Sequence, residues 1–208
     1  MVSDARDFGI NMPPKLKPMA LPPMILASGS PRRQELLRSL GLEFQVIPAK
    51  VEEVEPEFLT PRETCLLNAC RKAMTLARRH PAALVIGADT IVCLGLRIFG
   101  KPASLDEARK TLAELAGKTH DVITGVCLVC QRQQRMVQFS VRTRVRFRSL
   151  KAHQIERYLK FVNPLDKAGG YAIQEHGKML VEKISGSYSN VVGLPLERLT
   201  REIARFKI

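Results

Sequence analysis

The sequence predicts an α/β protein in which strands alternate with helices along the chain. Residues 24–27 and 82–88 are apolar runs of the kind that form strands buried on both faces. A serine and a proline at 30–31 begin a stripe of leucines with helical spacing, so a helix is expected directly after the first strand. Residues 139–148 alternate between apolar and basic side chains, as in a strand with one exposed face.

The turn between the first strand and the first helix carries the densest chemistry in the chain. Ser28, Gly29 and Ser30 are small, so their backbone N–H groups can face outward at the positive end of a helix. Arg32 and Arg33 add guanidinium groups in the first helical turn, and these bind phosphate oxygens well. The turn is not of the Walker type, because no Gly-Lys-Ser/Thr follows it. It indicates a phosphate site, and the alternative is a solvated helix start.

Length, composition and charge are those of a globular protein with an unusual excess of positive charge. The 208 residues can build one substantial core, or two small lobes that share a cleft. The formal net charge of +13 suggests polyanionic partners: nucleotides, nucleic acid or acidic surfaces. Five cysteines, an odd number, do not resemble a disulfide framework, so a cytoplasmic protein is expected. No apolar run approaches the ~20 residues that span a bilayer, so no membrane partner is expected.

Residues 1–23 differ in composition from the rest of the chain. They contain prolines at 13, 14, 18, 22 and 23, and they lack the continuous apolar core of a signal peptide. We expect a flexible, proline-rich leader over 1–23 and one domain over 24–208. A mis-assigned start, with Met24 opening the functional chain, is the alternative.

The next segments contain an acidic cluster followed by a helix. Residues 44–47 alternate like a short strand and lead into 52–57, where carboxylates are dense. This cluster is typical of a solvated loop, although one or two of its carboxylates could hold a divalent cation. Thr60 begins the pattern of a capping box and opens a helix. Lys72 lies beside the apolar stripe of that helix, where it could edge a cleft or be an exposed lysine.

The apolar run at 82–88 is followed directly by an acid, Asp89. Ligands of open α/β sheets gather at the carboxyl ends of strands, so Asp89 is well placed for chemistry. The alternative is that Asp89 only begins a turn. Residues 91–99 have the pattern of a hairpin that leads to Lys101, which stands between a glycine and a proline. Such a rigid loop suits a phosphate contact, although a surface lysine would look the same.

A further helix and a long strand follow. Ser104 is expected to cap the helix, and Gly117 to end it. Residues 120–130 alternate as a strand, so Cys127 and Cys130 point to opposite faces. They cannot ligate one metal without a bend, and we interpret them as core thiols.

A strongly basic strand comes next. Between 131 and 160, nine lysines and arginines stand against one acid. One face of the strand at 139–148 consists of Arg142, Arg144, Arg146 and Arg148. This is typical of a half-buried strand with a solubilising face. It also suits a nucleic-acid footprint, although neither interleaved aromatic residues nor a recognition-helix pattern accompanies it.

The last third of the chain contains a loop with the character of a binding site. Ser149 is expected to cap a helix that ends before Pro164. Residues 166–174 combine Asp166, Lys167, two glycines and an amide, which favours a site loop over a linker. The remaining segments are a strand at 179–184, a small-residue loop at 186–195 and a last helix from Leu196.

Five motifs in this order resemble the Maf family of nucleoside triphosphate pyrophosphatases, from about Met24 to the C-terminus. The motifs are Ser28-Gly29-Ser30-Pro31-Arg32-Arg33, Gly87-Ala88-Asp89-Thr90, Gly100-Lys101-Pro102, Asp166-Lys167-Ala168-Gly169-Gly170-Tyr171-Ala172-Ile173-Gln174 and Asn190-Val191-Val192-Gly193-Leu194-Pro195. The resemblance implies an elongated, bent mixed β-sheet flanked by helices, with two lobes and a central cleft, as in Maf and ITPase-like proteins. It also implies metal-assisted hydrolysis of a nucleoside triphosphate to the monophosphate and pyrophosphate, and a homodimer.

The resemblance assigns roles to particular residues. The proton acceptor of the family falls on Asp89, and the positions associated with base choice fall on Arg32, Thr90 and Gln174. The threonine and the glutamine resemble the branch that acts on dTTP and UTP, whereas the 7-methyl-GTP branch typically differs at these places. Relatives often carry a glutamate where this chain has Asn163, a departure that puts metal affinity in question.

From these positions we expect attack of water at the α-phosphorus of dTTP, UTP or modified pyrimidine nucleotides. Asp89 would hold the water, Glu53 and Asp89 would be ligands of Mg²⁺ or Mn²⁺, and Asp166 and Lys167 would line the far wall. Gln174 suits uracil or thymine, because its amide donates to a carbonyl and accepts from a ring N–H. The phosphate contacts expected are Ser28, Ser30, Arg33, Lys72 and Lys101. The alternatives are a pyrophosphatase for another base, such as 7-methylguanine, and a non-catalytic nucleic-acid or nucleotide-binding regulator, for instance of cell division.

Overall fold

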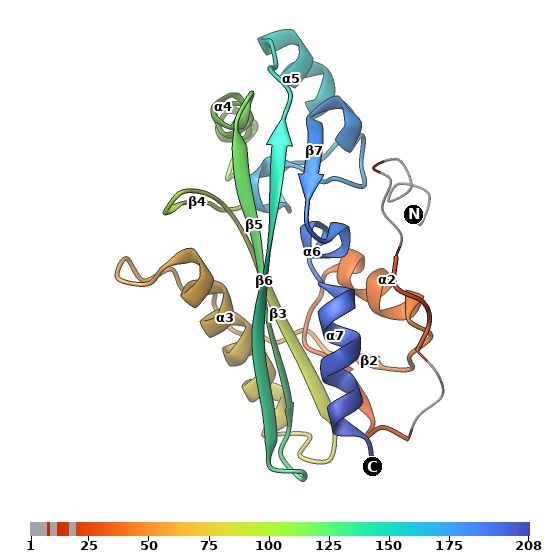
Figure 1. Cartoon of the computed structure of the whole chain (residues 1–208). Coiled ribbons are helices and arrows are strands. Elements are labelled where there is room, and N and C mark those ends of the chain that lie inside the picture. The colour runs from red at the N-terminus through yellow and green to blue at the C-terminus, as the bar shows by residue number, and fades with distance from the viewer. Residues whose placement is uncertain (1–7, 9–11, 17–19) are drawn as a thin grey trace.

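Helices flank both faces of a long mixed sheet, as the sequence predicts (Figure 1). The structure is a computed structural model that describes residues 8, 12–16 and 20–208. Of the leader expected over 1–23, residues 1–7, 9–11 and 17–19 lie outside the described residues. Among the described ones, Phe8, Met12 and Leu16 pack against the core, and the Leu16 N–H donates to the Leu40 carbonyl over 3.0 Å.

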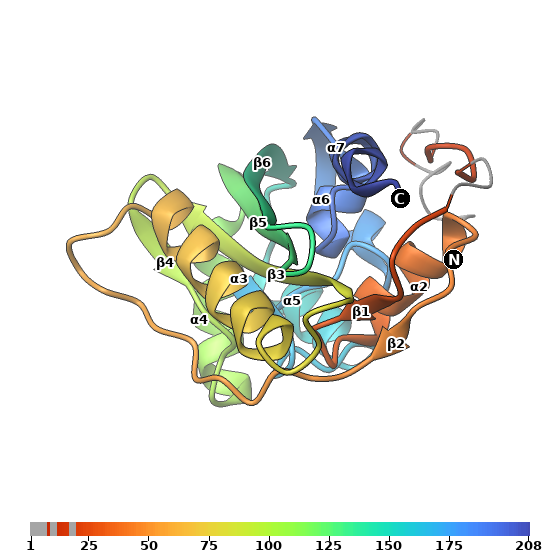
Figure 2. The same ribbon diagram turned by 90° about the horizontal axis from the view of Figure 1, so that it is seen from below.

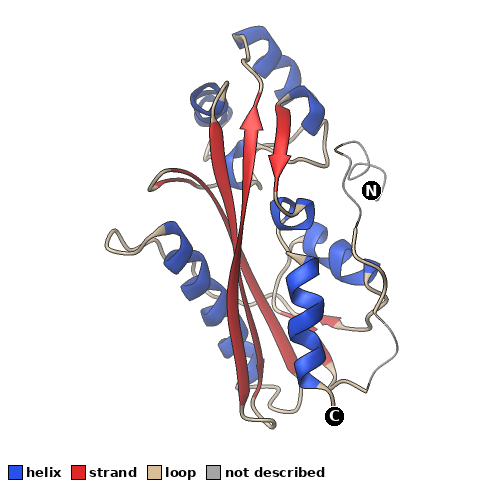
Figure 3. Ribbon diagram, in the orientation of Figure 1, coloured by secondary structure: helices blue, strands red, loops and turns tan. Residues whose placement is uncertain are grey.

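Seven strands in the described part of the chain form one sheet. Their order is β2-β1-β3-β5-β6-β7, with β4 paired to the end of β3. β1 is parallel to its neighbours β2 and β3, whereas the pairs β3–β5, β5–β6 and β6–β7 are antiparallel. The long strands twist strongly about one another (Figure 3). The strands are β1 (Met24–Leu26), β2 (Gln45–Val46), β3 (Leu84–Leu94), β4 (Arg97–Phe99), β5 (Thr119–Cys130), β6 (Arg135–Phe147) and β7 (Val181–Ser185).

The helices sort onto the two faces of this sheet (Figure 2). On one face α3 packs Ala69, Ala73 and Leu76 against Ile25 and Val85. On the other face α2, α6 and α7 bury their apolar residues in the larger core cluster. The helices are α2 (Pro31–Ser39), α3 (Pro61–Ala77), α4 (Leu105–Leu115), α5 (Ala152–Leu159), α6 (Tyr188–Val192) and α7 (Leu196–Ile203), with 3₁₀ turns η1 (Ala168–Gly170), η2 (Gly177–Met179) and η3 (Ala204–Phe206).

Two glycines let the backbone of α3 lie directly on the sheet. A Cβ on Gly87 of β3 would lie 2.3 Å from the carbonyl oxygen of Ala69, and one on Gly125 of β5 would lie 2.6 Å from the carbonyl of Cys65. No side chain fits at either place. The close approach places the buried face of α3 next to Ala88 and Asp89, which follow Gly87 in β3.

Two of the helix start signals in the sequence, at Thr60 and at Ser104, are confirmed. The Thr60 hydroxyl accepts from the Glu63 N–H, and the Glu63 carboxylate accepts from the Thr60 N–H, which is a complete capping box. The Ser104 hydroxyl accepts from the Glu107 N–H at the start of α4. All five cysteines are free, as expected, and Cys127 and Cys130 are buried, as expected for core thiols.

The strand predicted to end at Asp89 instead continues to Leu94. Pairing with β5 holds it, from Val85 opposite Val129 to Cys93 opposite Asp121. The hairpin expected over 91–99 is therefore formed by the end of β3 and by β4. Asp89 lies in the middle of a strand, not at its end.

Two expectations about the C-terminal third are also wrong. The helix attributed to a Ser149 cap begins at Ala152, because the Gln154 side chain accepts from the Lys151 N–H and makes Lys151 the capping residue. The loop expected over 186–195 contains α6, whose first turn is capped by the Ser187 hydroxyl. The small polar residues of this segment, which predicted a loop, instead cap and form the short helix α6.

Candidate active site

A cavity of about 550 Å³ opens where β1 ends, between the turn that follows β1, the start of α2, α3, the middle of β3 and the segment 166–174. Every site residue expected from the sequence lines it, although these residues come from six separate segments. They are Ser28, Ser30, Arg32, Arg33, Glu53, Lys72, Asp89, Thr90, Lys101, Asp166, Lys167 and Gln174.

The position of Asp89 in the sheet explains why it faces this cavity. β1 pairs with β3 only as far as Leu26 opposite Ile86. Asp89 lies three residues further along β3, where the β1 side of the strand has no partner strand. The expectation that Asp89 ends its own strand is wrong, but it lies just beyond the carboxyl end of the neighbouring parallel strand. On its other side Asp89 pairs with Gly125, which has no side chain.

Asp89 is buried and paired with Lys72. The Lys72 ammonium donates to Asp89 Oδ1 over 2.8 Å, to Glu53 Oε1 over 2.6 Å and to the Ala88 carbonyl over 3.4 Å. Asp89 and Lys72 are 6% and 8% exposed, so they interact with little screening by water. Lys101 lies at the open side of the cluster, with its Nζ 4.0 Å from Glu53 Oε2.

The charge balance of this cluster favours an ionised Glu53. Partial burial raises the pKa of the Glu53 carboxyl, but the hydrogen bond and charge of Lys72 lower it, and the charges of Lys101 and Arg33 act in the same direction. The net effect is a pKa below the usual range for a glutamate. Glu53 is therefore a carboxylate at neutral pH.

Arg33 is held rigidly at the start of α2. Its Nε donates to the Gly193 carbonyl over 2.8 Å, and its terminal nitrogens donate to Ser28 Oγ over 3.2 Å and to Thr90 Oγ1 over 2.9 Å. Burial lowers the pKa of the guanidinium, while the charges of Asp89 and Glu53 oppose this effect. An arginine keeps its charge under such conditions, so Arg33 presents a fixed cation to the cavity.

The far wall of the cavity is a second cluster of ion pairs. Arg32 reaches across from α2 to Asp166, with 3.1 Å between its Nη1 and Oδ2. Lys167 lies 2.7 Å from Asp166 Oδ1 and 3.3 Å from Glu175 Oε1. Burial raises the pKa of Asp166, but Lys167 and Arg32 together hold it below its usual value. Arg32 and Lys167 thus face the cavity already paired with carboxylates.

Thr90 and Gln174 differ in how tightly the protein holds them. The Thr90 hydroxyl accepts from Arg33 and shares a 3.0 Å hydrogen bond with the Thr124 hydroxyl, so Thr90 orients Arg33. Thr124 in turn donates to the Asn190 carbonyl over 3.1 Å. Among the residues that the structure describes, none hydrogen-bonds the Gln174 amide, which lines the cavity and is available to a ligand.

The residues present fit a divalent cation only if a ligand helps to hold it. In the described part of the chain no three histidine, cysteine, aspartate or glutamate side chains converge on one point. Glu53 and Asp89 offer two carboxylates, with the Lys72 ammonium between them. Mg²⁺ is usually bound by one or two carboxylates together with substrate phosphates and water, so this pair fits such an ion in the presence of a polyphosphate.

Asn163, the one departure from the family pattern expected from the sequence, is not among the residues that line the cavity. Its side-chain oxygen accepts from the Leu165 N–H over 3.1 Å, and its carbonyl accepts from Lys167 Nζ over 2.8 Å. Asn163 thus holds Lys167 in place through its backbone, which any residue type supplies.

Sequence reasoning missed several residues that build the site. Asn68 contacts the segment that carries Glu53, and Glu175 pairs with Lys167. Asn68 lies four residues before Lys72, so helical spacing places both on one face of α3 and could have identified it. No comparable signal marks Glu175, because its pairing depends on the path of an irregular loop.

The comparisons with known proteins agree with this geometry. A family model described as "Maf-like protein" matches residues 23–206. A Bacillus cereus protein named dTTP/UTP pyrophosphatase is 43% identical over 185 residues, which are 89% of this chain and 96% of the relative. A Bacillus anthracis protein of the same name is 44% identical over the same shares of the two chains.

Solved structures support the fold as well. The structure of the Staphylococcus aureus Ham1 protein is similar with a TM-score of 0.50 and 14% identity, over 88% of this chain and 99% of that one. In the described part of the chain, no helix combines the length and the apolar character needed to cross a bilayer. The motifs, the cavity on which they converge and the family match over most of its length show that the chain belongs to the Maf family.

Proposed function

We propose that the chain is a nucleoside triphosphate pyrophosphatase that hydrolyses dTTP and UTP to the monophosphate and pyrophosphate. The observation that carries the proposal is the arrangement of Asp89. It is a buried carboxylate, held by Lys72, in the same cavity as the fixed cation Arg33 and the phosphate-binding turn. The two Bacillus relatives named dTTP/UTP pyrophosphatase support the choice of substrate.

The reaction is an in-line displacement at the α-phosphorus. A water molecule beside Asp89 gives its proton to the carboxylate, and its oxygen forms the new bond to phosphorus. The bond from the α-phosphorus to the bridging oxygen breaks, and pyrophosphate leaves with the electron pair. Ser28, Arg33 and Lys101 hold the phosphates, so that the reaction depends on positioning and on neutralising charge.

Glu53 and Asp89 would hold a divalent cation of the Mg²⁺ or Mn²⁺ type when a triphosphate is bound. When bound, such an ion neutralises charge that develops on the triphosphate. Because the protein supplies only two carboxylates, we expect weak binding of the ion in the absence of nucleotide.

The five free cysteines are in keeping with a cytoplasmic location.

Base choice is assigned to the wall opposite the phosphates. The Gln174 amide can donate to a carbonyl and accept from a ring N–H, which is the pattern that uracil and thymine present. Adenine and cytosine lack a ring N–H beside a carbonyl, so they would leave the amide unpaired in the cavity. The proposal therefore predicts a preference for uracil and thymine over adenine and cytosine.

A substrate panel tests the proposal. The purified protein is mixed with Mg²⁺ or Mn²⁺ and with each of dTTP, UTP, CTP, ATP, GTP and 7-methyl-GTP, and the products are separated. We expect monophosphate and pyrophosphate, formed fastest from dTTP and UTP. Release of orthophosphate would contradict the bond that we assign, and fastest turnover of 7-methyl-GTP would contradict the base.

A further inference from the structure

The segment from Pro48 to Leu59, which carries Glu53, has no helix or strand of its own. Among the described residues, its main chain is tied to the rest of the protein by two hydrogen bonds, both at Val54 and both to the side chain of Asn68. Glu53 immediately precedes this anchor. The position of its carboxylate therefore depends on Val54 being held against α3.

Asn68 is built into this junction with all its polar atoms used. Its Oδ1 accepts from the Val54 N–H over 2.9 Å, and its Nδ2 donates to the Val54 carbonyl over 2.9 Å and to Asp89 Oδ2 over 3.5 Å. The residue is 4% exposed. A buried amide is costly unless it is hydrogen-bonded, and this one is satisfied only when the segment is in place.

Helical spacing links this anchor to the reactive cluster. Lys72 follows Asn68 by one turn on the same face of α3, and it holds the Glu53 carboxylate at 2.6 Å. One face of α3 thus binds both the side chain of Glu53 and the backbone of Val54. Because Glu53 is about half exposed, its pairing with Lys72 alone would not order the segment.

We propose that Asn68 is a positioning residue that locks the Glu53 segment onto α3 and so completes the cluster of Glu53, Lys72 and Asp89. The inference rests on the proposed pyrophosphatase function and adds a residue to it. Asn68 acts through Glu53, so its removal should matter only while Glu53 is present. Small displacements of such a group cost as much as ~100-fold in rate.

The first test uses Asn68→Leu, which keeps the size of the side chain but loses its hydrogen bonds. The matched control is Thr64→Val, one turn earlier on α3, where a buried hydroxyl has no hydrogen-bond partner in the described residues. We expect hydrogen exchange at the Val54 amide to accelerate at least ~10-fold in Asn68→Leu and to stay unchanged in Thr64→Val. Equal exchange in both variants overturns the anchor. If the leucine variant does not fold, Asn68→Asp is used, which cannot donate to the Val54 carbonyl.

The second test is a double-mutant cycle with Glu53→Gln. We expect Asn68→Leu to lower kcat/KM for UTP by ~10–100-fold in the wild-type background, but by less than ~3-fold when Glu53→Gln is present. Effects that multiply would show that Asn68 acts independently of Glu53, through general stability or through its contact with Asp89 Oδ2, and would overturn the proposal. If the wild type cleaves no nucleotide, the proposed function fails, while amide exchange at Val54 still decides whether Asn68 anchors the segment.

Discussion

At the scale of single residues, the site depends on one lysine shared by two carboxylates. Lys72 donates to Asp89 and to Glu53, so neither acid faces the other without a cation between them. This arrangement favours an ionised Glu53 in a cavity that must also accept a polyanion. In the described part of the chain, Asp89 Oδ2 accepts a hydrogen bond only from the Asn68 amide, at 3.5 Å, and it can also meet a water molecule.

Replacing Asp89 separates binding from turnover. We expect Asp89→Asn to lower kcat for UTP by ~10²–10⁴-fold, because an amide cannot take a proton from water. The dissociation constant for UTP, measured by calorimetry, should change little, since Ser28 and Arg33 are untouched. Turnover within a few-fold of the wild type would remove Asp89 from its role.

His120 predicts an acid-sensitive fold. It is 1% exposed, and its Nε2 shares a hydrogen bond of 2.8 Å with the Tyr171 hydroxyl. Burial lowers the pKa of His120 from 6.5 to about 4. The unfolded chain therefore takes up a proton as pH falls below 6.5, whereas the folded chain does so only near pH 4, and stability is lost across this window.

The size of this loss can be measured. A shift of this size corresponds to about 3 kcal/mol of unfolding free energy between pH 6.5 and pH 4. Urea unfolding at several pH values should show that loss in the wild type and a smaller slope in His120→Phe, which keeps a ring against Phe147 and Tyr171. Equal slopes in the two proteins would contradict the assignment.

The sequence was sufficient to find the residues that bear charge, but not those that hold them. Asp89, Lys72 and Arg33 could be predicted because each stands next to a strand or helix signal. Helical spacing could place Asn68 on the same face of α3 as Lys72, but not reveal its role, since that role depends on Val54, which lies in a segment without a regular pattern. The role of Thr90 as a partner of Arg33 likewise depends on a contact between separate elements.

At the scale of elements, the contact between α3 and β3 sets the geometry of the site. Gly87 lies two residues before Asp89, and Ala69 and Ala73 of α3 pack directly on it. This close packing places Lys72 of α3 within 2.8 Å of Asp89. Any increase in the separation of helix and strand would break that pair.

Gly87→Ala tests this dependence. The added methyl group would lie 2.3 Å from the Ala69 carbonyl and 2.8 Å from the Ala73 nitrogen, both backbone atoms that cannot move independently of the helix. We expect a loss of about 3 kcal/mol or more in unfolding free energy, together with reduced kcat. Gly100→Ala is the control, because a Cβ there meets nothing within 4 Å, and it should change stability by less than about 0.5 kcal/mol. Similar losses in the two variants would mean that the close approach is unimportant.

Element types were predictable where capping residues and apolar stripes coincide. The capping box at Thr60 and the cap at Ser104 fixed the starts of α3 and α4. The length of β3 was not predictable, because Gly87, Ala88 and Asp89 look like a strand end unless the pairing with β5 is known. The same limit applies to α6, a short helix that packs against β5, β6 and α2.

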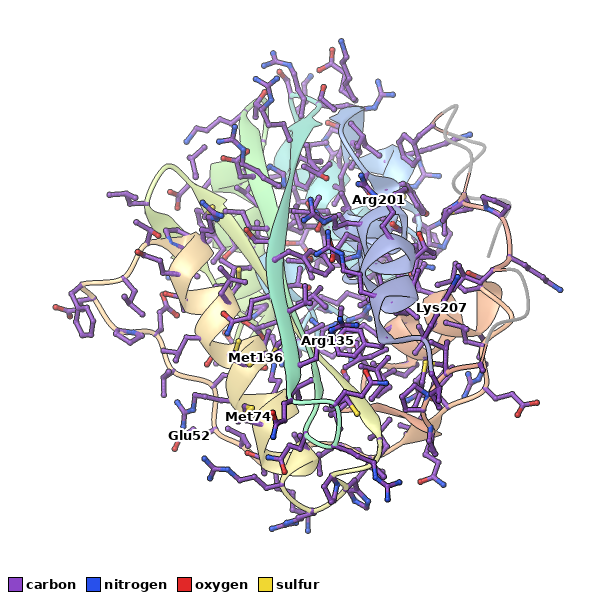
Figure 4. All side chains as sticks on the ribbon, turned by 60° about the horizontal axis from the view of Figure 1, so that its bottom comes forward. Glu52, Met74, Arg135, Met136, Arg201 and Lys207 are labelled. Atoms are coloured by element: carbon purple, nitrogen blue, oxygen red, sulfur yellow. The ribbon has the colours of Figure 1, made fainter. Side chains whose placement is uncertain are left out.

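At the scale of the whole molecule, the positive charge is spread well beyond the cavity. Arg135, Arg201 and Lys207 are exposed around the ends of β6 and α7 (Figure 4). The basic face predicted for β6 is confirmed, with Arg142 and Arg144 exposed. Arg142 lies 3.7 Å from Asp121, and Arg146 lies 3.2 Å from Glu182, so part of this charge is neutralised within the protein.

Neutralising this face distinguishes the enzyme from a nucleic-acid-binding regulator. Arg142 and Arg144 do not line the cavity, so we expect the double substitution Arg142→Gln, Arg144→Gln to leave kcat/KM for UTP within ~2-fold of the wild type. A regulator would instead bind duplex DNA in a salt-dependent manner and lose that binding in the double variant. Such loss, without any nucleotide hydrolysis by the wild type, would favour the regulator.

The convergence of distant segments is the property that local patterns predict least. The turn at 28–33, Asp89 and the segment 166–174 are separated by long stretches of chain. Only their order, which is shared with a known family, indicated that they meet. The sheet order explains the meeting, because β1 and β3 are adjacent although α2, β2 and α3 lie between them in the sequence. The Arg32–Asp166 pair then joins the two sides of the cavity.

The most direct measurement of the central claim is the fate of the attacking oxygen. UTP is hydrolysed by the protein in water labelled with a heavy oxygen isotope, and the products are weighed by mass spectrometry. Attack at the α-phosphorus puts one labelled oxygen into UMP and none into pyrophosphate. Label in pyrophosphate or in orthophosphate would place the attack elsewhere and contradict the role of the cavity around Asp89.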